Sequence, residues 1–359
     1  EVQKKAKEEN KYIFVDCFTT WCGPCKMMSK NIFPLEEVGE FYNEHFINYK
    51  LDMEAEGDGV TFAKTYGVSA FPTYMFFTPE GEKVHRAVGS KPADRFIEDG
   101  KNAMDPEKQF FTVEARLEKS DKPIDWLNLA QLYQSNGVGI RNDLIKKYTE
   151  ATTSKEWSDQ EHWDLLIQVS LDLESPIYQH IVNNLDDYRS MSEEKRFEYF
   201  IDQPWNMLVS RCVYREKPTF EEAKSTLTEY LPKEMRREAL AYLEYSYAAK
   251  NQPEQHFEKL TTYVDGFVDD AEDLNGFAWE IVENEFSDPK QIVKGLKWVE
   301  KSISMEKNYN NLDTKAWLLY MAGDYDAAKK TAEEAIAQAE EEGADHEGTD
   351  VLLAMTSEH

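Results

Sequence analysis

Short apolar runs in the first third of the chain have the length and composition of buried β-strands. Tyr12–Val15 and Thr73–Phe77 are almost wholly apolar, and Phe46–Leu51 mixes apolar and polar residues. A strand covered on both faces is apolar throughout, because successive side chains point to opposite faces. Lys83–Val88 follows the turn Thr78–Gly81, whose Pro and Gly favour a hairpin. The pattern predicts four strands, the last of them antiparallel to the third.

Helical patterns separate these strands. We expect one helix to begin at Cys22 after a turn, a short one over Gly57–Tyr66, and another from about Pro92. The resulting order of strand, helix, strand, helix, strand, strand, helix is typical of an α/β fold. It predicts a mixed sheet with helices on both faces.

The chain beyond residue 105 lacks strand-like alternation and carries apolar residues three and four positions apart. This spacing predicts a succession of helices. Those that we expect are Asp125–Asn136, Glu161–Leu173, Pro176–Tyr188, Phe220–Tyr230, Lys233–Lys250 and Pro253–Val268.

Two segments near the C-terminus repeat. Leu312–Trp317 echoes Leu274–Trp279, and Ala328–Ile336 echoes Gly295–Ile303. With the turn Ala322–Ala328, this pattern resembles a tetratricopeptide repeat, whose period is about 34 residues. The resemblance is clearest at 274–340. Such helix pairs stack into a solenoid with one broad surface.

The change in hydrophobic pattern after residue 105 predicts two domains, 1–105 and 106–359. Eight of the 16 Gly lie in the first 105 residues, as tight turns between strands and helices require, whereas seven of the eight Trp lie after them. We therefore expect an α/β domain followed by an all-α domain of helical repeats.

Composition excludes several classes of protein. The 359 residues include 69 acidic and 41 basic ones, for a formal charge of −28. Nucleic-acid binding needs clustered Lys and Arg, and the sequence has no such cluster. The negative charge also disfavours docking on anionic lipid. No run of 18 apolar residues occurs, so we expect no membrane span.

The four cysteines are too few for a disulfide-stapled scaffold, and two of them form one Cys-x-x-Cys. At a turn from strand to helix, Cys22 would lie where unpaired N–H groups and the helix dipole stabilise a thiolate. Cys25 lies one turn further along and could attack a mixed disulfide. Gly23 relieves crowding in the turn, and Pro24 suits the first helical turn.

At this point the sequence resembles the thioredoxin family. Trp21, Cys22, Gly23, Pro24 and Cys25 form the family's active-site sequence. Further matches, in the family's order, are Asp16 at the buried acid, Tyr66-Gly67-Val68 before the cis-proline loop Phe71-Pro72-Thr73, and Gly89 in the last strand region. They cover residues 10 to 100.

The resemblance implies a role for each of these residues. It implies that Cys22 attacks, Cys25 resolves, and Asp16 assists proton transfer to and from Cys25. It also implies that Pro72 shapes a groove beside Cys22, where an extended substrate segment binds near Trp21, Gly23, Pro24, Phe71 and Thr73. Gly and Pro between the cysteines imply a reductase.

The sequence also departs from the family. Cys17 and Phe18 stand where the family usually has Phe-Trp, and Asn48 falls where we expect the Lys that accompanies the buried acid. Cys17 alternates with Asp16 and should face the other way. We expect an inert buried thiol there, and a bond from Cys17 to Cys212 would require the two domains to touch.

We weigh metal sites and reject them. Half of a zinc site would need a second pair of ligands, and the sequence has no second Cys-x-x-Cys or His-x-x-x-His. The acidic loop Asp52–Asp58 superficially resembles a calcium loop, but Ala63 occupies the position of the bidentate Glu. Trp279, Trp298 and Trp317 have helical spacing and are expected in the core. We expect neither a metal nor a cofactor.

Three functions remain in view. The first is a thiol–disulfide oxidoreductase that acts on protein disulfides, with an upstream electron donor and a protein partner on the helical domain. The second is a scaffold in which the helical repeats bind a partner and the α/β domain is secondary. The third is a redox-gated chaperone. The presence of both Cys22 and Cys25 favours the first.

The prediction of a cellular compartment rests on a resemblance to other domains. Lys26-Met27-Met28, Ile32-Phe33 and Val38 look like envelope-associated thioredoxin-like domains. The sequence begins at Glu1 without Met or a basic-then-apolar leader, so either a targeting segment was removed or this is a fragment. We expect a periplasmic or otherwise secreted protein of a Gram-negative bacterium, with the cytoplasm as the alternative.

Overall fold

A computed structural model describes residues 1–284, 286 and 288–356 of the chain. Residues 285 and 287, in the repeat-like stretch 274–340, and 357–359, at the end of the predicted helical domain, lie outside these. The chain divides into two compact units, Glu1–Pro204 and Trp205–His359. The predicted boundary between residues 105 and 106 stays a prediction.

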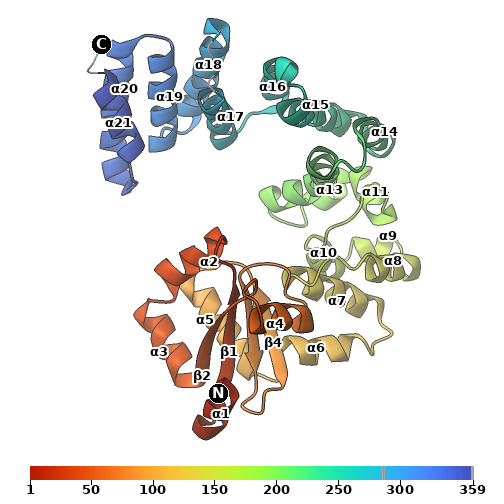
Figure 1. The fold of residues 1–359 in the computed structure, drawn as a ribbon. Coiled ribbons are helices and arrows are strands. Elements are labelled where there is room, and N and C mark those ends of the chain that lie inside the picture. Colours follow the sequence, from red (N-terminus) through yellow and green to blue (C-terminus); the bar gives the residue numbers. More distant parts are fainter. Residues whose placement is uncertain (285, 287, 357–359) are drawn as a thin grey trace. The chain divides into compact units, whose positions relative to one another are not determined.

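The first unit begins with an α/β region in which a mixed sheet carries helices on both faces, as predicted (Figure 1). Its elements are α1 (Val2–Glu9), β1 (Tyr12–Phe18), α2 (Gly23–Met27), the π-helix η1 (Met28–Ile32), α3 (Glu36–His45), β2 (Phe46–Asp52), α4 (Asp58–Tyr66), β3 (Thr73–Phe77), β4 (Lys83–Val88) and α5 (Ala93–Met104).

The sheet has the strand order β2-β1-β3-β4. Strand β1 pairs in parallel with β2 and antiparallel with β3, and β4 pairs antiparallel with β3. The hairpin between β3 and β4 closes where the Gly81 N–H donates to the Thr78 carbonyl at 2.9 Å, and Gly81 has a φ of 92° that favours glycine.

Alternation along β1 divides the core into two layers. Phe14 points into an aromatic layer with Tyr42 of α3 and Phe96 of α5. Ile13, Val15 and Cys17 point to the other face, which α1, α4 and α6 cover. In the aromatic layer the rings of Tyr42 and Phe96 stack with centroids 4.4 Å apart. Because both faces are covered, β1 is apolar at nearly every position.

Helices continue from the α/β region through the rest of the first unit. They are α6 (Phe110–Leu117), α7 (Pro123–Ser135), α8 (Asn142–Ala151), α9 (Ser154–Trp157), α10 (Gln160–Leu166), α11 (Pro176–Val182) and α12 (Leu185–Arg189). The predicted helix Glu161–Leu173 is wrong beyond residue 166. Residues 169–171 and Leu173 are buried in a non-helical segment, and three consecutive buried residues do not fit the single buried stripe of an amphipathic helix. The predicted helix Pro176–Tyr188 breaks after Val182.

In the residues that the structure describes, the second unit contains helices and no strands. Helix α13 (Glu194–Arg215) spans the boundary between the two units and contains Pro204. The sequence pattern did not predict this helix, and a Pro in a helix interior is unusual because it removes a hydrogen bond. The helices that follow are α14 (Phe220–Tyr230), α15 (Lys233–Asn251), α16 (Pro253–Phe267), α17 (Ala271–Glu283), α18 (Pro289–Met305), α19 (Tyr309–Met321), α20 (Tyr325–Glu342) and α21 (Glu347–Thr356).

Small residues let α19 and α20 pack closely. Ala316 on α19 and Ala328, Ala332 and Ala335 on α20 are fully buried. Trp298 is buried, and Trp279 and Trp317 are half-buried. Within the described ranges, no helix is both long and apolar enough to cross a membrane.

A buried histidine fastens α6 to the sheet. His85 on β4 accepts a hydrogen bond at its Nδ1 from the Phe110 N–H, the first of α6, at 2.9 Å. Burial, together with a smaller contribution from the charge of Lys91, lowers the pKa of His85 from 6.5 to about 4. Only neutral Nδ1 can accept this bond, so the contact depends on an uncharged imidazole.

We therefore predict that the first unit loses stability as the pH falls from about 6.5 to about 4. A folded-state pKa below the unfolded one means that the unfolded chain binds the extra proton, at a cost to folding of roughly 3 kcal/mol at most. Denaturant unfolding at several pH values measures it. In His85→Gln, which can still accept the bond, this part of the pH dependence should vanish, and an unchanged pH profile would contradict the prediction.

Candidate active site

The cysteine pair lies where the first helix after β1 begins. Cys22 is the N-cap of α2, and its Sγ accepts a hydrogen bond from the Cys25 N–H at 3.1 Å. A disulfide joins Cys22 and Cys25, and both are buried. Opening of the disulfide would leave a Cys22 thiolate at a position where backbone N–H groups stabilise negative charge.

The two residues between the cysteines are exposed. Pro24 occupies the first turn of α2, where its missing N–H leaves no carbonyl unpaired. A Cβ added at Gly23 would meet nothing within 4 Å. The turn between the two cysteines is therefore exposed, and no neighbouring atom crowds Gly23.

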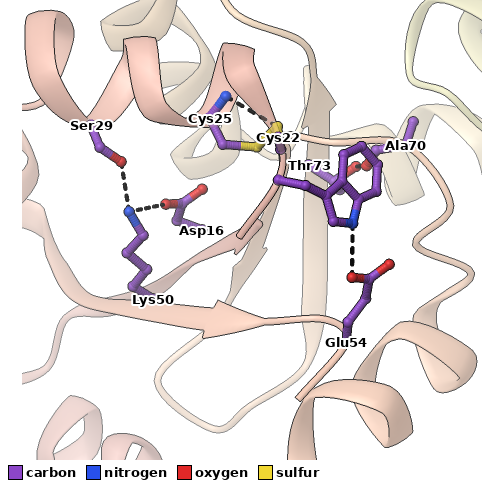
Figure 2. Close-up of a disulfide and its surroundings, with 9 residues drawn as sticks. Asp16, Cys22, Cys25, Ser29, Lys50, Glu54, Ala70 and Thr73 are labelled. Atoms are coloured by element: carbon purple, nitrogen blue, oxygen red, sulfur yellow. Dashed lines mark hydrogen bonds and ion pairs between the residues drawn. A yellow bond between two sulfur atoms is a disulfide. The ribbon is translucent and has the colours of Figure 1, made fainter. Parts of the chain in front are cut away.

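Asp16 lies beneath the cysteine pair with almost no access to solvent (Figure 2). Its side chain is buried, and among the described residues neither carboxylate oxygen has a hydrogen-bond partner. Lys50 Nζ lies 3.7 Å from Asp16 Oδ2 and donates to Ser29 Oγ at 2.6 Å. Burial raises the pKa of Asp16 from 3.8 to about 6, and Lys50 opposes the rise.

The expectation that Asn48 takes the place of the lysine is wrong. Asp16 on β1 pairs with Lys50 on β2, two positions further along. In a parallel pair, residues that face each other across the register lie on the same side of the sheet. Asn48 instead pairs with Phe14 and donates to Asn43 Oδ1.

Trp21, the residue before Cys22, is 64% exposed. Its Nε1 donates to Glu54 Oε2 at 2.8 Å (Figure 2), and its ring meets Phe71 edge to face at 6.0 Å between centroids. The acidic loop Asp52–Asp58 thus supplies the residue that orients the indole.

The loop before β3 lies at the same end of the sheet as Trp21, whose ring contacts Phe71 of this loop. The Phe71–Pro72 peptide bond is cis, and the Pro72 carbonyl accepts from the Gly89 N–H at 2.9 Å. Thr73 is buried and donates from Oγ1 to the Ala70 carbonyl at 2.7 Å. These bonds hold the loop at both ends beside Trp21.

Cys17 faces away from the site, into the layer that contains Ile13 and Val15. Burial raises the pKa of its thiol far above the ordinary value, and the charge of Asp16 adds to the rise. Cys17 and Cys212 are both free and buried. Cys17 is thus a protonated core thiol.

The structure brings the predicted site residues Asp16, Trp21, Cys22, Cys25 and Phe71–Thr73 together at one end of the sheet. Sequence reasoning missed Lys50, Ser29 and Glu54. Strand alternation from a correct register would have found Lys50, whereas Ser29 and Glu54 carry no local signal. In the part of the chain that the structure describes, no three His, Cys, Asp or Glu side chains gather as metal ligands would.

Comparisons with known proteins find similarity to thioredoxins in the region that contains this site. A family model for a thioredoxin-like domain matches residues 1–102. A thioredoxin of Aspergillus fumigatus is 39% identical over 90 residues, which are 25% of this chain and 76% of that protein. Thioredoxin-1 of Saccharomyces cerevisiae is 40% identical over 85 residues, 24% of this chain and 75% of that protein.

Among solved structures, a proposed disulphide-isomerase of Bacteroides thetaiotaomicron is similar to this chain. Its solution structure is 46% identical, covers 29% of this chain and 85% of its own, and aligns with a TM-score of 0.27.

We predict that Asp16→Asn stabilises the oxidised protein at pH 7. The raised pKa means that folding stability is lost as the pH rises through about 6, because the unfolded chain ionises Asp16 more readily. The shift from 3.8 corresponds to a gain of roughly 3 kcal/mol as an upper bound. Urea unfolding at pH 7 measures it. The gain should disappear below about pH 4, and equal stability of both proteins at pH 7 would refute the prediction.

Proposed function

Because this chain belongs to the thioredoxin family through residues 1–102, we propose that it is a thiol–disulfide oxidoreductase that reduces disulfides of protein substrates. The observation that carries the proposal is the Cys22–Cys25 disulfide at the start of α2, with the buried Asp16 carboxylate and its ion-pair partner Lys50 beneath it. A binding platform would need neither the second cysteine nor the buried acid.

In the proposed reaction, two electrons pass from the cysteine pair to the substrate. The Cys22 thiolate attacks one sulfur of a substrate disulfide, whose S–S bond breaks and releases a substrate thiolate. The Cys25 thiol then loses its proton and attacks the Cys22 sulfur. The mixed disulfide breaks, the Cys22–Cys25 disulfide forms, and the second substrate thiolate leaves.

Asp16 would take the proton from Cys25. With a pKa of about 6, the carboxylate is mostly ionised at neutral pH yet close enough in proton affinity to accept and return a proton. Neither of its oxygens accepts a hydrogen bond from any residue that the structure describes, so an acceptor position is open. Lys50 limits the rise in pKa, and Ser29 holds the lysine beside it.

The substrate segment would bind in extended form along Phe71–Thr73. Exposed Trp21 and half-buried Phe71 offer it apolar surface, and the exposed Gly23 and Pro24 leave room for its backbone beside the disulfide. An upstream electron donor must then reduce Cys22–Cys25 for the next turnover.

We place this chemistry in the periplasm of a Gram-negative bacterium, with the cytoplasm as the alternative. The support is the resemblance of Lys26-Met27-Met28 and the residues that follow to envelope-associated domains. Detection of the native protein in a periplasmic rather than a cytoplasmic fraction tests the placement.

The helical region would recruit a protein partner. Helices α17–α20 carry the repeat-like pattern and pack in sequence through buried small residues, as in a stacked array. The second candidate function is a scaffold or a redox-gated chaperone. The same stacked helices support it, because they would bind a partner in either case. It predicts partner binding that survives loss of both cysteines.

We predict that Cys22→Ser abolishes reduction of insulin disulfides by the protein with dithiothreitol as reductant, because no nucleophile remains. Cys25→Ser should attack once and accumulate as a mixed disulfide, visible by non-reducing electrophoresis and mass spectrometry. Cys17→Ser, outside the site, is the matched control and should keep full activity. Full activity of Cys22→Ser would exclude the proposed function.

We further predict that a chain ending at residue 193, before α13, keeps disulfide exchange with small substrates but loses a protein partner. The α/β region and α6, which His85 fastens to it, remain intact in this chain. Pull-downs from native extract with the full and shortened chains measure the difference. An identical set of partners would contradict recruitment by the second unit.

A further inference from the structure

The segment that joins β4 to α5 touches both parts of the site. The Gly89 N–H donates to the Pro72 carbonyl at 2.9 Å, and the Lys91 N–H donates to Met28 Sδ at 3.4 Å. Met28 follows Cys25 by one helical turn. Gly89–Lys91, the rim segment from here on, therefore bridges the loop that contains Pro72 and the helical stretch that carries the cysteines.

A mostly buried ion pair anchors the rim segment. Lys91 Nζ donates to Asp99 Oδ2 at 2.6 Å, and the two side chains are only 19% and 16% exposed. Asp99 lies on α5, about two turns beyond Lys91. Where water is largely excluded, a charged hydrogen bond is strong and its geometry is well defined.

The helix at the other end of this pair is itself fixed. Phe96 of α5 is buried in the aromatic layer, and its carbonyl accepts from Tyr42 OH at 2.7 Å. Gly100 lies so close to α3 that an added Cβ would come within 2.5 Å of the Phe41 ring. Lys91 thus ties the rim segment to a helix that has little freedom to move.

We propose that Lys91 and Asp99 are positioning residues that hold the rim segment as one wall of the substrate-binding surface. The proposal rests on the proposed oxidoreductase function. Ser90 is exposed at the middle of the rim segment, between the two anchoring backbone bonds. A protein segment bound beside Pro72 would meet this wall, whereas a small disulfide needs only the sulfur of Cys22. The pair therefore sets affinity for protein substrates and leaves the sulfur chemistry unchanged.

Single-turnover kinetics of the full-length reduced protein tests the proposal. Lys91→Gln, too short to reach Asp99, should raise the half-saturating insulin concentration by about fivefold and leave the limiting rate unchanged. Its rate with the small disulfide dithiobis(nitrobenzoate) should also be unchanged. Lys91→Arg, which keeps the pair, should return the insulin value to within about twofold of the wild type.

Two further variants keep the test decisive. Glu98→Gln removes the exposed pair Arg95–Glu98 on the same helix, whose side chains are 67% and 53% exposed, and should change nothing. If Lys91→Gln fails to fold, Asp99→Asn keeps an acceptor for Lys91 and should show the same selective rise at a smaller size.

The outcomes separate the two proposals. Equal losses with insulin and with dithiobis(nitrobenzoate), or an unchanged half-saturating concentration in every variant, would overturn the positioning role. A wild-type protein that reduces neither substrate would instead refute the oxidoreductase function.

Discussion

A carboxylate buried under a cysteine pair is the constraint on which the site depends. The Asp16 side chain is buried, and neither of its oxygens accepts a hydrogen bond within the described part of the chain. A lysine 3.7 Å away offsets only part of the cost of burial. Such an arrangement is unfavourable for folding, so the surrounding structure must hold it in place. It suits the proton transfer proposed for this residue, because the raised pKa of the carboxyl lies close to neutral pH.

The sheet makes this arrangement possible by alternation. Neighbouring residues of β1 point to opposite faces, so Asp16 lies under the reactive pair while Cys17 is sealed in the other layer. The same strand therefore carries a carboxyl whose pKa is raised to about 6 and a thiol that stays protonated. Both layers are closed by helices, and α6 is included through His85 although it follows the α/β region in sequence.

The site is also supported from outside its own motif. Glu54 orients Trp21, Ser29 holds Lys50, and the Lys91–Asp99 pair fastens the segment that touches both Pro72 and Met28. Each support comes from a different element. The reactive cysteines thus lie at the end of the sheet where segments next to all four strands come together.

Sequence alone determined the features that are local. The apolar runs gave the strands, the Cys-x-x-Cys spacing placed one cysteine at a helix start, and the motif residues came together as the family resemblance implied. These follow from side-chain periodicity and covalent spacing, which are written into neighbouring positions. Tertiary structure decided the rest: Lys50 rather than Asn48 accompanies Asp16, the stretch after Leu166 leaves the helix, and Lys91 reaches Asp99. The first outcome depends on strand register and the other two on how the folded chain packs, and periodicity along the sequence encodes neither.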